Sequence, residues 1–298
     1  MGKKYFIPGY GEVDKIYCFA VSDFQTYEFC PFQFFVNHHL DKKYELADGN
    51  FNQTVGNLLD GAIKKYHRSG GQKDLSYIEA VLRAQYREYL EYLEQNSGPS
   101  FNAAMRPYLT EEALSAAIET FRNYYLALDG RIHPSIGEAK FAKVPIITSD
   151  GCYTLWGAAD AYELGDDGMP EIVDYKYRED VEKGKKFMDM DNMPKIYTLL
   201  AADYLRSLGY KRARFIVRIW QDPRDTSLYE EFDLQLVDNF KDFFKQKIDK
   251  ILGTTEVVFC EYPNCKACSH PQRNDFLKEL EDKGFVRMSG EEFLNSRG

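Results

Sequence analysis

Residues 153–177 (YTLWGAADAYELGDDGMPEIVDYKY) constrain the fold of this chain more than any other stretch. They contain two runs rich in β-branched and aromatic residues, 153–164 and 171–177, which are separated by the sequence GDDG at 165–168. Two such runs on either side of a glycine- and aspartate-rich turn predict a β-hairpin. A sheet is therefore expected near the centre of the fold.

Charged side chains interrupt both predicted strands. Asp160 lies in the first, and Asp174 and Lys176 lie in the second, where their spacing of two places both on one face. Unpaired charges among apolar neighbours destabilise a strand or change their protonation. Two carboxylates beside a lysine suit a hard divalent cation with a phosphate substrate. The alternative is a cross-strand ion pair on a solvated face, which contributes under about 1 kcal/mol.

This arrangement resembles the PD-(D/E)xK nuclease superfamily, and within it the RecB-like branch. The first acid of that branch closes a G-x-x-D turn, as Asp160 does here, and the second acid and the lysine follow as D-Y-K at 174–176. The resemblance implies that one or two Mg²⁺ or Mn²⁺ ions bind Asp160, Asp174 and the backbone carbonyl of Tyr175. It also implies that Lys176 orients or deprotonates the attacking water.

Two helices carry further positions of the same family pattern. Residues 55–67 have apolar side chains at helical spacing, and the RecB-like motif G-x-x-x-H falls on them with Asp60 in place of the histidine. Aspartate also binds Mg²⁺ or Mn²⁺, so Asp60 is expected to be a ligand. Related nucleases carry Q-x-x-x-Y on the helix predicted at 193–208. Here Tyr197 fits the tyrosine, expected at the DNA, whereas Met193 replaces the glutamine.

Other charged residues suggest contacts with nucleic acid. The β-rich run 212–220 places Arg212, Arg214 and Arg218 on one face, which suits the DNA backbone. Glu138, at the start of a strand predicted at 138–147, is either an additional acid near the metal ions or a solvated strand-end glutamate. The net charge of -9 argues against a general nucleic-acid coat protein but allows an enzyme with a local basic groove.

Three cysteines fall within nine residues near the C-terminal end: Cys260, Cys265 and Cys268. Their C-x-x-C pair is typical of soft-metal sites. RecB-like nucleases with an iron-sulfur cluster, which this chain resembles, add a lone cysteine before proline from the N-terminal helix, here Cys30. The third cysteine lies upstream of the pair, unlike the usual family spacing, so a zinc site or His270 as a ligand stays open. A redox pair and a buried free Cys30 are the other interpretations.

The composition places the chain among globular proteins of the cell interior. Its 298 residues are 44% hydrophobic, and no apolar run is long enough to cross a bilayer. Residues 1–15 lack the apolar core of a secretory signal, so a cytoplasmic location is expected. In a reducing compartment the six cysteines are thiols or metal ligands more often than disulfides.

The resemblance extends over residues 22–268 and implies an α/β fold. A central mixed sheet flanked by helices, the restriction-endonuclease-like core, should carry a helical insertion and a cysteine-rich C-terminal segment pinned to the N-terminal helix. The expected organisation is a single nuclease domain over 1–298. Its parts are the N-terminal helices (22–70), the helical insertion (71–135), the catalytic α/β core (136–236), and the C-terminal helix with the cysteine-rich tail (237–298).

The families most similar in pattern are the CRISPR-associated four-cysteine exonucleases, the AddB and RecB nuclease domains and phage exonucleases. They imply a Mg²⁺- or Mn²⁺-dependent exonuclease that acts on DNA ends or single strands in recombination, repair or phage DNA processing. Recombination or CRISPR-adaptation proteins would be its partners. Because the histidine and the glutamine are replaced, a catalytically impaired DNA-end-binding or scaffolding protein is the alternative. A zinc-stabilised RNA-processing enzyme is a third.

Overall fold

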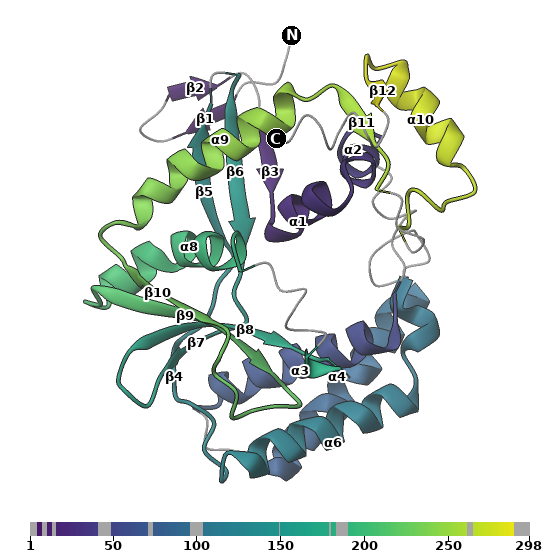
Figure 1. The fold of residues 1–298 in the computed structure, drawn as a ribbon. Helices are drawn as coiled ribbons and strands as arrows, with labels where there is room; N and C mark the ends of the chain where they lie inside the picture. Colours follow the sequence, from purple (N-terminus) through teal and green to yellow (C-terminus); the bar gives the residue numbers. More distant parts are fainter. Residues whose placement is uncertain are drawn as a thin grey trace. The chain divides into compact units, whose positions relative to one another are not determined.

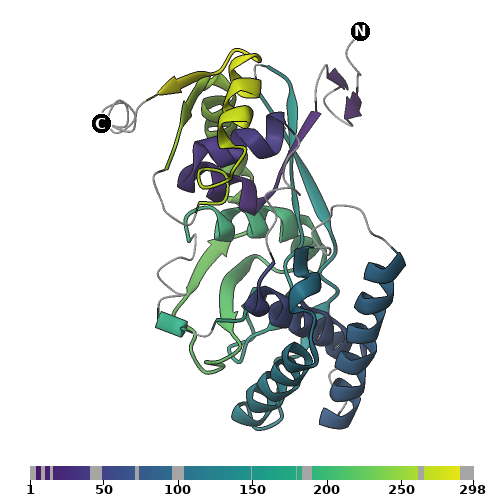
Figure 2. The same cartoon turned by 90° about the vertical axis from the view of Figure 1, so that its right-hand side faces the viewer.

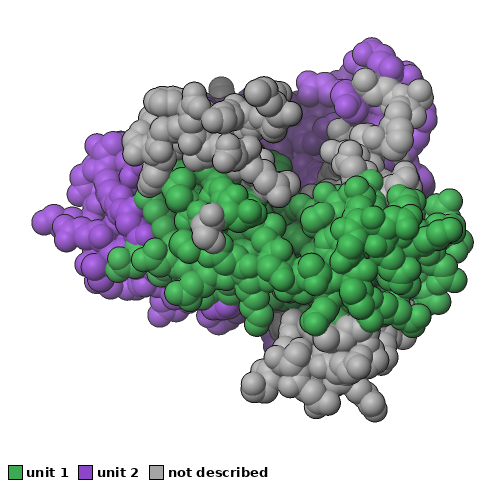
Figure 3. Space-filling view, turned by 90° about the horizontal axis from the view of Figure 1, so that it is seen from above, with its two compact units in different colours: residues 1–47, 143–156, 239–298 green, residues 48–142, 157–238 purple. Residues whose placement is uncertain are grey.

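The computed structural model describes residues 5–7, 11–13, 16–40, 49–70, 74–95, 104–148, 150–178, 180–182, 190–260 and 265–288. The chain forms two compact units, each assembled from separate stretches of sequence (Figure 3). Unit 1 comprises Met1–Ala47, Lys143–Trp156 and Asn239–Gly298, and unit 2 comprises Asp48–Ala142 and Gly157–Asp238.

Unit 2 is built on a five-stranded mixed sheet. Its strands are β4 (Ser135–Gly137), β7 (Ala161–Leu164), β8 (Pro170–Lys176), β9 (Arg212–Ile219) and β10 (Tyr229–Asp233). They follow the order β10-β9-β8-β7-β4, in which β8 and β9 are parallel and the other neighbours are antiparallel. The predicted hairpin is confirmed as the pair β7 and β8.

Helices cover both faces of this sheet (Figure 1). The crossover helix α8 (Met193–Ser207) joins the parallel strands β8 and β9, and its Tyr197 stacks on Phe215 of β9 with ring centroids 5.7 Å apart. Against the opposite face pack α3 (Phe51–Arg68), α4 (Leu75–Gln95) and α6 (Glu111–Ala127), which Figure 2 shows beneath the sheet. The expected mixed sheet between helices is therefore confirmed.

Local sequence explains where α3 and α6 begin. Asn50 precedes α3, and its side chain accepts a hydrogen bond from the Gln53 N–H at 2.8 Å. Thr110 does the same for α6, accepting from the Ala113 N–H at 3.2 Å. The buried residues of α3 recur at helical spacing, so one stripe of the helix packs into the core: Val55, Leu58, Leu59, Ala62, Ile63 and Tyr66.

The first predicted strand, 153–164, is wrong as a continuous element. It divides into β6 (Cys152–Gly157) and β7, with β6 in a separate three-stranded sheet of order β3-β6-β5. The break falls at glycine followed by two alanines, which favour strands weakly. The strand predicted at 138–147 also begins later, as β5 (Ala142–Ile147), and Glu138 lies in the segment between β4 and β5.

Unit 1 contains that three-stranded sheet, in which β3 (Ile16–Phe19) pairs with β6. Its other elements are β1 (Tyr5–Ile7), β2 (Gly11–Val13), α1 (Val21–Phe29), α2 (Pro31–His39), α9 (Phe240–Gly253), β11 (Glu256–Val258), α10 (Arg273–Glu281) and β12 (Val286–Met288). Short 3-10 helices occur at Arg106–Tyr108 in unit 2 and at Val237–Asn239. Among the described helices none is long and apolar enough to cross a membrane.

Candidate active site and metal centre

The hairpin brings the two predicted acids to neighbouring positions. Ala161 of β7 pairs with Val173 of β8, so Asp160, one residue earlier, lies opposite Asp174. The Asp160 N–H donates to the Val173 carbonyl at 2.9 Å, and the Asp160 Oδ2 atom accepts from the Tyr175 N–H at 2.9 Å. Asp160 is thus hydrogen-bonded to the backbone of β8 at Tyr175, the residue between Asp174 and Lys176.

Asp174 and Lys176 form an ion pair on the α8 face of the sheet. The Lys176 Nζ atom lies 2.6 Å from the Asp174 Oδ2 atom, and Asp174 is only 3% exposed. Burial raises the pKa of Asp174, and the charge of Lys176 offsets part of this effect. Burial alone would lower the pKa of Lys176, but Asp174 and Asp160 raise it above its ordinary value. Lys176 is therefore a cation.

Helix α3 brings a third acid and a second lysine to the hairpin. The Lys64 Nζ atom lies 3.3 Å from the Asp160 Oδ1 atom. Asp60 lies one helical turn before Lys64 on the same face. Burial, and after it the charge of Asp160, raise the pKa of Asp60 well above its ordinary value. Asp60 is therefore close enough to the hairpin acids for their charges to act on it, and its role as a metal ligand stays a prediction.

The chemistry of these side chains suits a hard divalent cation. The charges of Asp160 and Asp174 act on Asp60, and within the described part of the chain the Oδ1 atom of Asp60 is buried without a hydrogen-bond partner. An unsatisfied buried oxygen and mutually repelling acids are what a bound cation would relieve. The other two acids are held by Lys64, the Tyr175 N–H and Lys176.

A buried network that sequence reasoning missed supports the site from below. Glu163 of β7 is 0% exposed, and its Oε1 atom accepts from the Tyr175 hydroxyl at 2.7 Å and lies 3.0 Å from the His67 Nε2 atom. Its Oε2 atom lies 3.3 Å from the Arg218 Nε atom. Although burial opposes it, His67 and Arg218 lower the pKa of Glu163, which is ionised. The available signal was a glutamate inside an apolar strand run.

The three predicted DNA-binding arginines have carboxylate partners in the structure. Arg218 is 2% exposed and binds Glu163 and Glu171, so it does not lie at a surface where a phosphate could reach it. Arg214 lies 3.0 Å from Glu171, and it also contacts Asp167 and Glu231. Arg212 binds Glu231 at 2.6 Å. Arg218 therefore does not fit the expected row of phosphate contacts, whereas the Arg212 side chain is 61% exposed and its contact with DNA stays a prediction.

Tyr197 lies beside the acids. It is half-buried in α8, and burial, followed by the charges of Asp174 and Asp160, raises its pKa. Met193, which occupies the glutamine position of the family pattern, is 3% exposed and packs into the core. The α8 face of the site is therefore more apolar than the pattern of related nucleases implies.

In unit 1 the four predicted cysteines come together. Their sulfur atoms all lie within 4.8 Å of one another, with 3.5 Å between Cys30 and Cys268 and 3.8 Å between Cys260 and Cys268. None of these separations is a disulfide bond. Hydrogen bonds from Cys268 and Cys30 lower the pKa of Cys265, and the thiolate is the metal-binding form. The predicted grouping is confirmed as a site that can hold a metal.

The Cys-Pro sequence explains how Cys30 reaches this position. Cys30 ends α1 and is the N-cap of α2, and its sulfur accepts from the Gln33 N–H at 3.3 Å. Pro31 occupies the first turn of α2, where its missing N–H costs nothing. Gln33 also accepts a hydrogen bond from the Cys265 thiol at 3.5 Å. One turn of α2 thus contacts sulfurs from both ends of the chain.

Comparisons with known proteins show the family of this chain. A family model described as the PD-(D/E)XK nuclease superfamily matches residues 19–273. No curated protein matches the chain. A solved structure titled "Crystal structure of SSO0001" is similar at 13% sequence identity and a TM-score of 0.22, over 53% of this chain and 70% of that chain.

Proposed function

Because the chain belongs to the PD-(D/E)XK nuclease superfamily, we propose that it is a metal-dependent DNA exonuclease of the RecB-like branch. It would act on DNA ends or single strands in recombination, repair or phage DNA processing. The observation that carries the proposal is the gathering of Asp60, Asp160 and Asp174 around Lys176 at the hairpin.

The residues that would hold one or two Mg²⁺ or Mn²⁺ ions are Asp60, Asp160, Asp174 and the carbonyl of Tyr175. When bound, such an ion polarises the scissile phosphate and lowers the pKa of a water molecule. The hydrogen bond from the Tyr175 N–H to Asp160 holds the peptide group that joins Asp174 to Tyr175, directly before that carbonyl. Asp60 supplies an oxygen that has no other protein partner within the described residues.

Lys176 has the second role in the reaction. Its Nζ atom carries three donors and pairs with Asp174, so it can orient the attacking water and offset the negative charge that develops on the phosphate. Lys64, paired with Asp160, is a second cation for the same phosphate. Both lysines would exchange a carboxylate partner for a phosphate oxygen when DNA binds.

Digestion of end-labelled single- and double-stranded DNA, and of circular DNA, with Mg²⁺, Mn²⁺ or EDTA tests the proposal. The Asp174→Ala and Lys176→Ala variants should lose roughly 10² to 10⁴ in cleavage rate and still bind DNA. Asp166→Asn is the matched control, because Asp166 lies on the same hairpin with a fully exposed side chain. Cleavage of circular DNA would exclude a strict exonuclease.

Wild-type protein that binds DNA and never cuts it with any divalent ion would contradict the enzyme and favour the scaffolding alternative. Equal cleavage by Asp174→Ala, Lys176→Ala and wild type would place the active site elsewhere.

We also propose that the four cysteines hold an iron-sulfur cluster, as the resemblance to four-cysteine nucleases implies. Zinc is a second candidate, and one observation favours it. A tetrahedral ion with Zn–S bonds of about 2.3 Å separates its sulfurs by about 3.8 Å, and the Cys260 and Cys268 sulfurs are 3.8 Å apart. In a four-iron cluster each cysteine binds a different iron, which requires wider spacing.

Metal analysis of protein purified without oxygen separates the two candidates. A cluster gives a brown protein that contains iron, whereas stoichiometric zinc in a colourless protein would contradict the cluster and keep the site. Absence of both metals would contradict a metal centre.

A further inference from the structure

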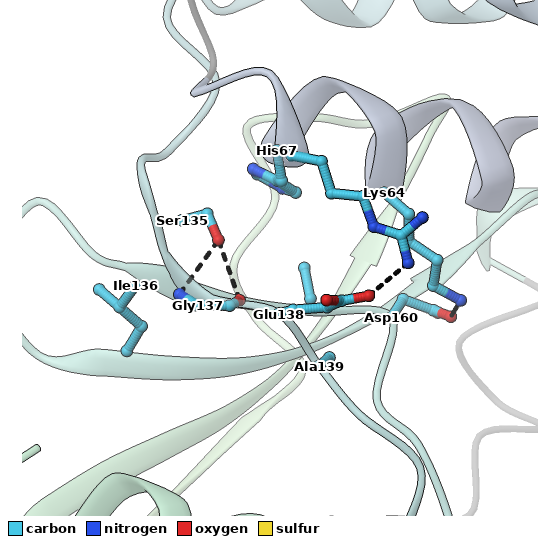
Figure 4. Close-up of a pocket in the computed structure, with 10 residues that line it drawn as sticks. Lys64, His67, Ser135, Ile136, Gly137, Glu138, Ala139 and Asp160 are labelled. Atoms are coloured by element: carbon cyan, nitrogen blue, oxygen red, sulfur yellow. Dashed lines mark hydrogen bonds and ion pairs between the residues drawn. The ribbon is translucent and has the colours of Figure 1, made fainter.

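A pocket of about 340 Å³ lies in unit 2 between α3 and the chain around β4. Figure 4 shows Lys64 and Asp160 at one end of this pocket, Ser135 and Gly137 toward the other, and Glu138 between them. Asp160 belongs both to the pocket wall and to the candidate active site, so whatever enters the pocket lies next to the acids. The volume is near the lower end for ligand sites, about 300 to 1,000 Å³, and suits one nucleotide-sized group.

The pocket contains two cations that are able to change partners. Arg68 of α3 pairs with Glu138, but these side chains are 61% and 47% exposed. Ion pairs between exposed groups are worth under about 1 kcal/mol, so Arg68 can exchange Glu138 for another anion at little cost. Lys64, at 39% exposure, pairs with Asp160 at 3.3 Å and can do the same.

Two other polar side chains line the pocket, His67 and Ser135. The His67 Nε2 atom lies 3.0 Å from the buried Glu163, and its Nδ1 atom has no partner among the described residues. The Ser135 hydroxyl donates to the Gly137 carbonyl at 3.0 Å and accepts from the Gly137 N–H at 3.2 Å. Lys64 and Arg68 are the lysine and the arginine of the pocket lining, and an incoming phosphate would pair with them.

The spacing of these two cations selects the ligand. They lie four residues apart on one face of α3, about 6 Å along the helix axis. Lys64 touches an acid of the active site, and Arg68 lies one turn farther away. Two cations in this order match two successive phosphates of one nucleic-acid strand. Lys64 would contact the phosphate at the acids, and Arg68 would contact the next phosphate along the strand.

We propose that this pocket binds the nucleotide next to the scissile bond of a single strand, with Arg68 gripping its phosphate. Glu138 occupies the guanidinium until the strand enters, and then releases it. The inference rests on the proposed function and extends it, because a pocket for one nucleotide accepts a single strand or an unpaired end and not an intact duplex.

Binding without catalysis gives the first test. The affinity of a fluorescent single-stranded oligonucleotide is measured in EDTA by anisotropy, for wild type and for Arg68→Gln. Loss of a charged phosphate contact should weaken binding roughly tenfold. It should also reduce the slope of the logarithm of affinity against the logarithm of salt concentration by about the amount that one phosphate contact contributes. Arg83→Gln is the matched control, because Arg83 of α4 is 53% exposed and also pairs with a glutamate, Glu79, outside the pocket.

Glu138→Gln should change the affinity for the oligonucleotide in the direction opposite to that of Arg68→Gln. Removing the competing carboxylate should tighten binding a few-fold, since Arg68 is then free for the phosphate. Weaker or unchanged binding would overturn the competitor role. Lost cleavage with unchanged binding would assign Glu138 to the chemistry and overturn that role too.

A neutral phosphate identifies the contact. Oligonucleotides with one methylphosphonate at successive positions should reveal a single site, next to the scissile bond, where wild type loses affinity and Arg68→Gln loses none.

The pocket proposal fails if Arg68→Gln and Arg83→Gln bind the oligonucleotide alike, or if no methylphosphonate position distinguishes wild type from Arg68→Gln. Cleavage by wild type would then still support the proposed function. If wild type binds but never cleaves, the proposed function fails and the anisotropy comparison still decides the pocket. Absence of any DNA binding overturns both.

Discussion

Asp60 is a residue at which stability and the proposed function conflict. Its Oδ1 atom is buried without a partner among the described residues, and burial and Asp160 raise its pKa. Nothing in the packing of α3 requires an acid there, because the core-facing stripe of the helix is formed by other positions. Such a carboxylate destabilises the free protein and suits one that binds a cation.

Asp60→Asn should therefore stabilise the protein in EDTA by about 1 to 3 kcal/mol at neutral pH. The pKa of Asp60 is higher in the folded than in the unfolded state. Below about pH 3.9 Asp60 is protonated in both the folded and the unfolded wild type, so it does not lower the free energy of unfolding there. The loss of stability grows as the pH rises from that value to the folded pKa, and it is complete above the folded pKa. Thermal unfolding of both proteins from pH 3.5 to 8 measures the difference.

The control for this comparison is Asp203→Asn, because Asp203 of α8 has a 98% exposed side chain and should change little. Added Mn²⁺ should stabilise wild type more than Asp60→Asn. An Asp60→Asn protein that is less stable than wild type at pH 7 in EDTA would contradict the interpretation of Asp60 as a strained ligand.

At the scale of elements, Glu163 joins three strands and a helix through one carboxylate. Tyr175 reaches it from β8, Arg218 from β9 and His67 from α3, while Glu163 itself belongs to β7. Tyr175 lies between Asp174 and Lys176 on β8, and His67 lies three residues after Lys64 on α3. The network therefore sets the position of α3, with Asp60, against the hairpin, with Asp174.

Replacing Glu163 by Gln should destabilise unit 2 by about 3 kcal/mol, because it leaves the buried charge of Arg218 with less compensation. Urea unfolding measures the loss. Glu231→Gln is the comparison, since Glu231 also binds two arginines but is 29% exposed and should cost under about 1 kcal/mol. Equal losses in the two variants would show that the buried network has no special role.

At the scale of the whole molecule, the two candidate metal sites lie in different compact units. The four cysteines that could hold a soft metal belong to unit 1, and the carboxylates that we propose as ligands of a hard cation belong to unit 2. Cys30 and Cys268 are 238 residues apart in sequence, so a metal between them closes a long loop of chain. Closing such a loop removes conformational freedom from the unfolded state, and metal binding is linked to folding.

Cys268→Ala should lose the bound metal and lower the thermal midpoint of the protein, since three thiolates hold either a cluster or a zinc ion less tightly. Metal content and differential scanning calorimetry measure both effects. Cys18→Ser is the control, because Cys18 is exposed and outside the group of four sulfurs. Retention of metal and midpoint in Cys268→Ala would show that the four sulfurs meet without binding a metal.

The chemistry of the candidate site was predictable from local sequence. Asp160, Asp174 and Lys176 lie on two strands joined by a short turn, so their convergence follows from the strand period and the hairpin alone. The cysteines near residue 260 were recognisable from spacing, and Cys30 only through the resemblance to four-cysteine nucleases, which carry a cysteine before proline. The helical spacing of apolar residues likewise predicted α3, because this signal is contained within about twenty consecutive residues.

Other features depended on contacts between residues distant in sequence. The alternation of β9 correctly placed Arg212, Arg214 and Arg218 on one face, but only strand order put Glu171, Glu163 and Glu231 opposite them. The same holds for the split of residues 153–164 between two sheets and for the pocket beside Asp160. A sequence determines which face of an element each side chain occupies, because that period is local. Which partner covers that face is decided by long-range packing, and here packing placed Arg218 of the predicted DNA-binding row in a buried network beneath the acids.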